Sequence, residues 1–205
     1  MNELFRVSRR AALGTALAGL LRALPLEQIQ LGITTDEIDD DPKVAAAFLA
    51  RFNLHWAEVR NVWGKYNTAQ PEERVREARG IFDAAKVRVS ILDTAFFRSD
   101  IPTGAALDKE WALLDAAMDR GEIFGTKLLR IFAFVPKDGS TGDSAAWPRS
   151  YELLKEAAVR AHRRGFRLAV ENLKGGYVQT GADAARLLKA VPHEALGLVW
   201  DPNNA

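Results

Sequence analysis

Short apolar runs alternate with longer amphipathic segments along most of the chain. The runs are rich in Val, Ile, Leu and Phe, which is typical of strands buried in a parallel sheet. They predict six strands, at residues 30–34, 54–59, 87–92, 127–134, 166–171 and 196–201. Strand-like sequence in the last two continues to residues 173 and 204.

Between these runs, apolar residues recur every three or four positions, which predicts helices. We expect one helix to begin near Pro42 and others at 71–86, 107–124, 147–164 and 182–190. Pro42 suits the first turn of a helix, where its missing N–H would have no partner. Gly165 stands just after the fourth of these helices, where glycine often ends a helix.

Strands separated by helices of this size predict parallel βαβ units. Two architectures fit, an open doubly wound sheet and a barrel. A dinucleotide-binding sheet would have a glycine-rich turn after its first strand, whereas residues 35–41 form an acidic loop that would repel a pyrophosphate. The sequence also lacks a GxxxxGK[ST] motif. We therefore expect an α/β fold over residues 29–205 and favour a barrel over an open sheet.

The composition is that of a globular protein. Of the 205 residues, 48% are hydrophobic and 27% are charged, which excludes a disordered or fibrous chain. Lys and Arg number 28 against 27 Asp and Glu, so the net charge of +1 does not favour binding to nucleic acid. The chain has no cysteine, which excludes disulfides, thiolate metal sites and cysteine nucleophiles.

The first 25 residues differ from the rest. The basic start Ser8-Arg9-Arg10 precedes an apolar run at 11–21, which is shorter than the roughly 20 residues that span a bilayer. This pattern predicts a signal of the twin-arginine type, and hence a periplasmic or exported protein with no membrane span. The alternative is a short amphipathic helix on a cytoplasmic protein, because Arg22 interrupts the run and no clear cleavage site follows.

Two carboxylates stand at the ends of the last two predicted strands. Glu171 and Asp201 are 30 residues apart, about one strand-helix-strand unit. Ligands bind at the carboxyl ends of parallel strands, so we expect the two at one site. Neighbouring carboxylates repel unless a cation or a proton lies between them, which predicts Mg²⁺ or Mn²⁺ there, with proton transfer as a further role. The alternative is two acids that cap the following helices.

Other polar residues lie at or near strand ends. Glu58 and Arg60 close the second strand, and Arg130 lies inside the fourth, where a buried charge requires an anion. These three residues could contact a substrate or form ion pairs within the barrel. Trp63, Tyr66, Phe96 and Phe97 could form an apolar wall for a sugar ring, or simply pack in loops. None of His55, His162 and His193 is placed as a ligand.

At these positions the chain resembles the sugar phosphate isomerase/epimerase family with the xylose isomerase-like TIM barrel. The matching pieces are Leu31-Gly32-Ile33, Ala57-Glu58-Val59-Arg60, Leu129-Arg130-Ile131-Phe132, Val170-Glu171-Asn172-Leu173 and Trp200-Asp201-Pro202-Asn203-Asn204. Each piece is short, and their order and spacing together carry the resemblance.

The resemblance implies a (β/α)8 TIM barrel, of which about six βα units are present in this chain. It also implies that the barrel binds one divalent metal, Mn²⁺ or Mg²⁺, through Glu, Asp, His and Glu on successive strands. Glu171 and Asp201 would be the first two ligands, and Glu171 would also act in catalysis by proton transfer. The implied reaction isomerises or epimerises a small-molecule sugar or sugar phosphate through an enediolate. We expect the substrate contacts to be Glu58, Arg60, Arg130, Asn172 and Asn204.

The sequence ends at Ala205, just past the sixth strand, and the family's His and second Glu have no counterpart in it. We therefore expect a truncated member that binds metal weakly and whose activity is in doubt, with a homo-oligomer as one way to supply the missing strands. The alternatives are a non-catalytic sugar-binding or partner-binding remnant and a metal-dependent apurinic endonuclease. The last is disfavoured because those enzymes have a histidine at the position of Asn204 and because the net charge is near zero.

Overall fold

The computed structural model describes residues 29–137, 139 and 145–204. Within them, six strands form one sheet in which each strand pairs in parallel with the next strand of the sheet along the chain. The strands, in sheet order, are β1 (Gly32–Thr34), β2 (Trp56–Val59), β5 (Arg88–Asp93), β6 (Leu128–Ile131), β7 (Arg167–Glu171) and β8 (Leu196–Val199). This arrangement confirms the predicted parallel α/β fold with six strands, where a closed barrel of this type has eight.

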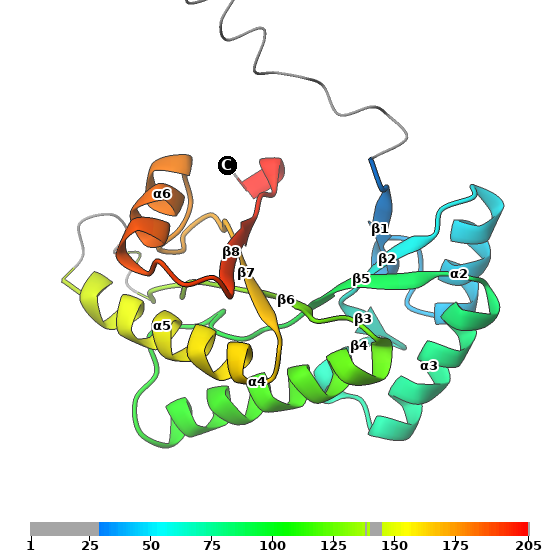
Figure 1. Ribbon diagram of the computed structural model, residues 1–205, viewed down its shortest axis with the longest axis horizontal. Coiled ribbons are helices and arrows are strands. Elements are labelled where there is room, and N and C mark those ends of the chain that lie inside the picture. The colour runs from blue at the N-terminus through cyan, green and yellow to red at the C-terminus, as the bar shows by residue number, and fades with distance from the viewer. Residues whose placement is uncertain (1–28, 138, 140–144, 205) are drawn as a thin grey trace, which may run out of the picture. The chain divides into compact units, whose positions relative to one another are not determined.

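In the described part of the chain, α-helices follow one another around the outside of the curved sheet (Figure 1). They are α2 (Pro42–Arg51), α3 (Glu72–Ala84), α4 (Ala105–Phe124), α5 (Trp147–Arg163) and α6 (Gly181–Ala190). Their starts and ends lie within two residues of the predicted ones. Gly165 has a φ of +72° just beyond α5, the left-handed conformation expected of glycine after a helix.

The hydrophobic core lies between the helices and the sheet. Leu114 and Met118 of α4 and Leu153 of α5 belong to the same buried cluster as Leu129 of β6 and Val170 of β7. Burying a side chain of this size stabilises a fold by about 1.5–3 kcal/mol. The largest fully buried side chains are the phenylalanines at positions 82, 96, 97, 124, 134 and 166.

Several strands are shorter than predicted at their carboxyl ends. β6 ends at Ile131 because the N–H groups of Phe132 and Phe134 donate to carbonyl groups of the loop after β5, at 3.1 and 2.9 Å, and not to a neighbouring strand. β7 ends at Glu171. β8 ends at Val199, and the predicted strand character up to Asn204 is wrong, because a 3-10 helix, η4 (Pro202–Asn204), follows.

A small hairpin that the sequence pattern did not predict follows β2. It consists of β3 (Asn61–Val62) and β4 (Lys65–Tyr66), joined through Trp63 and Gly64. The φ angles of these two residues are +49° and +73°, as a two-residue type I′ turn requires. The buried Asn67 side chain then donates to the carbonyl groups of Val59 and Asp93, at 3.1 and 2.8 Å, which ties the end of β2 to the end of β5.

β1 and β8 are the two edges of the sheet. None of the helices that the structure describes is long and apolar enough to cross a membrane. The predicted export signal, residues 1–25, lies outside the described residues.

Candidate functional site

A cavity of about 500 Å³ opens at the carboxyl ends of the strands. Residues from all six strands of the sheet line it, together with the segment that follows β8. This is the edge at which parallel α/β proteins bind ligands. The charged residues that line it include Glu58, Arg60, Asp93, Arg130, Glu171 and Asp201.

Arg130 connects three strands at the floor of this cavity. Its side chain is only 5% exposed. Nη2 donates to Asp93 Oδ2 at 2.7 Å, and Nη1 donates to the Thr94 carbonyl at 3.0 Å. Nε lies 2.9 Å from Glu171 Oε2. The alternative of ion pairing inside the barrel is therefore confirmed for Arg130, while direct contact with a substrate stays a prediction.

Asp93 is the functional candidate that the sequence pattern missed. It is the last residue of β5, is 2% exposed, and lies opposite Arg130 in the register between β5 and β6. The predicted strand stopped one residue earlier because the apolar run ends at Leu92. The strand-end rule that selected Glu171 would also have selected Asp93, had the strand been extended by one position.

Glu58 lies on β2, next to β5, and faces the same cavity. Burial is the largest of several causes that together raise the pKa of Glu58 to about 8. The negative charge of Asp93, a hydrogen bond between the two carboxyl groups and the charge of Glu171 also raise this pKa, while Arg130 lowers it. Glu58 therefore carries a proton at neutral pH.

Glu171 and Asp201 converge on one hydrogen-bond donor. The Asn204 amide nitrogen donates to Glu171 Oε1 at 3.1 Å and to Asp201 Oδ2 at 2.8 Å. Burial raises the pKa of Glu171, and the charges of Asp93 and Asp201 also raise it, whereas Arg130 lowers it. The structure thus brings the two predicted metal ligands together, with Asn204 between them.

Asn172 sets the position of Asp201. Although Asp201 follows β8 by two residues, its backbone N–H donates to Asn172 Oδ1 at 2.7 Å and its carbonyl accepts from Asn172 Nδ2 at 2.8 Å. Asn172 is 1% exposed, so both ends of its amide are used within the protein. Its predicted contact with a substrate stays a prediction, and the contacts in the structure hold Asp201.

Arg60 is held by the acidic loop after β1. Its Nε donates to Asp36 Oδ2 at 2.8 Å and its Nη2 to Glu37 Oε1 at 2.6 Å. Asp36 also accepts from the side chain of Asn61, at 3.0 Å. The acidic loop, which made a pyrophosphate site unfavourable, therefore forms ion pairs with Arg60 at the rim of the cavity.

The aromatic residues proposed as a sugar wall pack within the fold or near its surface. Phe96 and Phe97 are fully buried, with ring centroids 3.8 Å apart, so packing is the correct interpretation for them. The guanidinium of Arg74 lies 3.6 Å from the Trp63 ring centroid, and the Tyr66 hydroxyl accepts from an arginine. Neither these residues nor His55, His162 and His193 line the cavity.

The donor set near Glu171 fits a hydrated divalent ion and does not fit a closed protein cage. Within residues 29–137, 139 and 145–204, no three acidic or histidine side chains gather closely enough to hold a metal. Two carboxylate oxygens nevertheless converge on the Asn204 amide, which occupies the kind of position that a cation would take. Mg²⁺ is often held by one or two carboxylates and keeps several water molecules.

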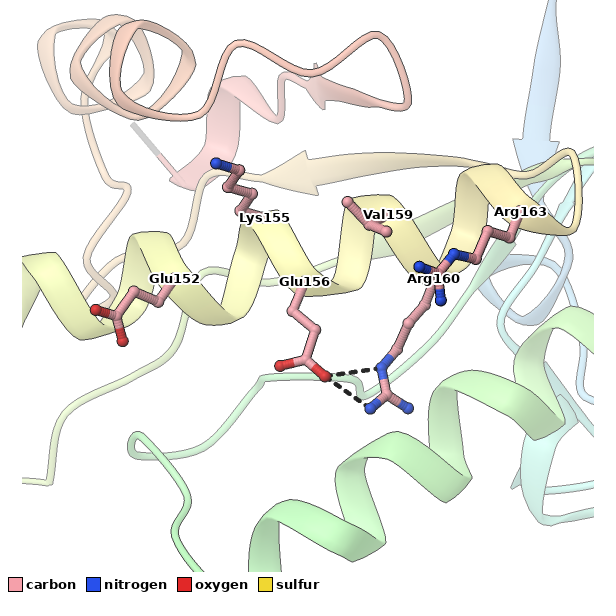
Figure 2. A pocket seen from close by; sticks show the side chains of 6 residues that line it. All are labelled: Glu152, Lys155, Glu156, Val159, Arg160 and Arg163. Atoms are coloured by element: carbon pink, nitrogen blue, oxygen red, sulfur yellow. Dashed lines mark hydrogen bonds and ion pairs between the residues drawn. The ribbon is translucent and has the colours of Figure 1, made fainter.

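A larger hollow, of about 670 Å³, lies along the outer flank of α5. The side chains that line it all come from this one helix (Figure 2). Glu156 and Arg160 pair with each other at 2.7 Å, and the Arg160 guanidinium also covers the Trp111 ring. This hollow is therefore a surface groove beside paired charges, and the smaller cavity at the strand ends is the candidate site.

Solved structures with the same fold include several sugar-modifying enzymes. D-Psicose 3-epimerase from Clostridium cellulolyticum H10, solved with D-tagatose, matches with a TM-score of 0.69 and 14% identity over 86% of this chain and 64% of that one. The probable 3-DHS dehydratase AsbF from Bacillus anthracis matches with a TM-score of 0.68 and 14% identity over 84% and 63%. A xylose isomerase-like TIM barrel protein from Mycobacterium smegmatis, in complex with magnesium, matches with a TM-score of 0.59 and 19% identity over 83% and 63%.

The chain thus spans slightly less than two thirds of the length of these structures. No curated protein matches it. The family model described as xylose isomerase-like TIM barrel matches residues 46–205, which is well over half of the chain. The chain therefore belongs to the xylose isomerase-like TIM barrel family.

Proposed function

We propose that this chain forms the substrate site of a divalent-metal-dependent isomerase or epimerase that acts on a sugar or sugar phosphate through an enediolate. The observation that carries the proposal is the convergence of Glu171 Oε1 and Asp201 Oδ2 at the edge of the strand-end cavity. Structures of the same fold were solved with D-tagatose, D-allulose and D-fructose, which supports a sugar as the substrate. The magnesium complex of the Mycobacterium smegmatis protein supports a divalent ion.

Glu171 and Asp201 would hold the ion, which would polarise the substrate carbonyl and make the proton on the adjacent carbon more acidic. Glu171 would act as the base for this proton. Its raised pKa favours that role, since a base works best when its pKa is near the working pH. Arg130 fixes one oxygen of Glu171 at 2.9 Å, and Asn172 fixes the backbone of Asp201.

Titration with MnCl₂ followed by thermal unfolding tests the proposal. Binding at 100 times the dissociation constant stabilises the folded state by about 2.7 kcal/mol. For a domain of this size, the midpoint should rise by about 5 to 10 °C. Glu171→Gln and Asp201→Asn should each abolish the rise. Glu152→Gln, which changes an exposed acid on α5, should keep it.

Two results would contradict the metal site: no rise at millimolar Mn²⁺, or the same rise in the wild type and in both site variants. Activity is measured by NMR in D₂O, as deuterium uptake at carbon and as formation of the epimer from D-fructose, D-tagatose or D-allulose.

A second candidate function is sugar binding without catalysis. Only two acids converge in the described residues, which is fewer than the three protein ligands of a typical catalytic metal centre. This alternative predicts that D-fructose binds with the same affinity in the presence and absence of EDTA. Loss of calorimetric binding heat on addition of EDTA would exclude it.

A further inference from the structure

The cavity contains a pair of carboxyl groups that the metal site does not use. Glu58 on β2 and Asp93 on β5 come from neighbouring strands, and their carboxyl groups share a hydrogen bond. Asp93 Oδ2 accepts from Arg130. Asp93 Oδ1 is buried, and no N–H or O–H group of the described residues donates to it. A proton on Glu58 supplies the donor that this oxygen lacks.

The charges around this pair also favour one retained proton. Glu58 lies beside Thr34 of β1 and lines the same cavity as Asp93 of β5, Arg130 of β6 and Glu171 of β7. The charges of these last three residues all act on Glu58. The three acids Glu58, Asp93 and Glu171 thus share one guanidinium. This is the guanidinium of Arg130, which is already paired with Asp93 and Glu171.

Arg60 does not neutralise the surplus charge. It lies two residues beyond Glu58 and is bound to Asp36 and Glu37. Two carboxyl groups in contact, with only one shared cation, hold a proton between them because both cannot be charged at low cost.

The position of the pair suits it to proton transfer. In sheet order, β5 and β6 separate β2 from β7, so Glu58 and Glu171 reach the same cavity from different sides of Arg130. Both residues line the cavity, where Glu58 is half-buried and Asp93 is 2% exposed. An acid that a substrate can reach and that is paired with a buried carboxylate can lose and regain a proton without rearrangement of the fold.

We propose that Glu58 and Asp93 form a second proton-transfer centre, which delivers its proton to the substrate from the side of the cavity that faces Glu171. This inference rests on the proposed function. Glu171 takes the proton from the carbon beside the carbonyl, and the C–H electron pair becomes the C=C bond of the enediolate. The Glu58 O–H then protonates the same carbon from the other face, the carbonyl re-forms, and Glu58 becomes a carboxylate. Solvent returns a proton to Glu58 and removes one from Glu171, so that protons and electrons balance.

Infrared spectroscopy tests whether the pair holds a proton, independently of any activity. A protonated carboxyl band should be present in the wild type at pH 7 and disappear as the pH rises through about 8. The difference spectrum between the wild type and Glu58→Gln should contain this band, and that between the wild type and Glu152→Gln should lack it. A wild type without such a band overturns the proposal even if Glu58→Gln does not fold.

The role in catalysis is tested by two NMR rates with D-fructose and Mn²⁺ in D₂O. Glu58→Gln should lower epimer formation about 100-fold, the size of a typical acid-catalysis effect. Deuterium uptake at carbon, which needs only Glu171, should fall far less. Equal losses of the two rates would show a structural role and overturn the proposal. If the wild type shows neither rate with any of the three sugars, the proposed function fails, and the infrared titration still decides whether the pair holds its proton.

Discussion

Replacing Arg130 with methionine removes the one cation that connects β5, β6 and β7. The methionine keeps most of the apolar length of the side chain but leaves Asp93 and Glu171 without their guanidinium partner. It also leaves the Thr94 carbonyl without its donor. Breaking a buried ion pair by removing one member costs about 3–5 kcal/mol because the remaining charge is left uncompensated. We expect a loss of this size in the free energy of unfolding at pH 8.

The loss should shrink on acidification. Without Arg130, the pKa of Glu171, which burial already raises in the wild type, rises further because the charge that opposes this increase is gone. The folded variant then binds more protons than the unfolded one, so its stability falls as the pH rises. Urea unfolding at pH 5.5 and pH 8 measures this difference. Adding Asp93→Asn to the variant should recover at least about 1 kcal/mol at pH 8, since one of the uncompensated charges is gone.

Arg164→Met is the matched control. Arg164 also pairs with two acids, Asp119 at 2.8 Å and Glu122 at 3.0 Å, but its side chain is 32% exposed. Exposed pairs contribute about 0–1 kcal/mol. If Arg130→Met cost no more than Arg164→Met, or if its cost were the same at both pH values, the account of Arg130 as a buried charge bridge would be refuted.

Further predictions concern Glu58 and two helical glycines. The stability of the wild type should fall between pH 4.5 and about 8, because the folded protein keeps a proton on Glu58 that the unfolded chain has lost. Since Glu58 is only half-buried, we expect the free energy of unfolding to fall by about 2 kcal/mol over this pH range, as measured by urea unfolding. In Glu58→Gln, the free energy of unfolding should depend less on pH. In α4, Gly121→Ala would place a Cβ 2.5 Å from Phe166 Cε1 and should destabilise the fold by about 1–3 kcal/mol. In α3, Gly80→Ala meets open space and should stabilise it by about 0.5–1 kcal/mol. Urea midpoints that move in the same direction for both glycine variants would contradict this packing argument.

The order of strands and helices could be predicted from the sequence because strands buried in a parallel sheet consist of nearly continuous apolar residues. It also placed Glu171 at a strand end, where the structure has it. The position of Asp201 depends on the Asn172 amide, which is 29 residues away, and no local pattern encodes that contact.

Arg130 illustrates the same limit inside the sheet. A charge within an apolar strand indicates that an anion is near, but only the register between β5 and β6 identifies this anion as Asp93. The β3–β4 hairpin was missed because strands of two residues are too short to show a period. Local sequence patterns therefore could not predict side-chain pairs between strands or strands of only two residues.

The order of strands along the sheet is also their order along the chain. During synthesis, each strand of this sheet can therefore pair with the strand synthesised just before it. None of the six strands needs a later segment of the chain in order to pair with its predecessor. Because domains generally begin to fold from the N-terminus during synthesis, this sheet can grow on the ribosome one βα unit at a time. Arg130 is synthesised after Glu58 and Asp93 and before Glu171, so two of its acidic neighbours precede it on the ribosome and the third follows it.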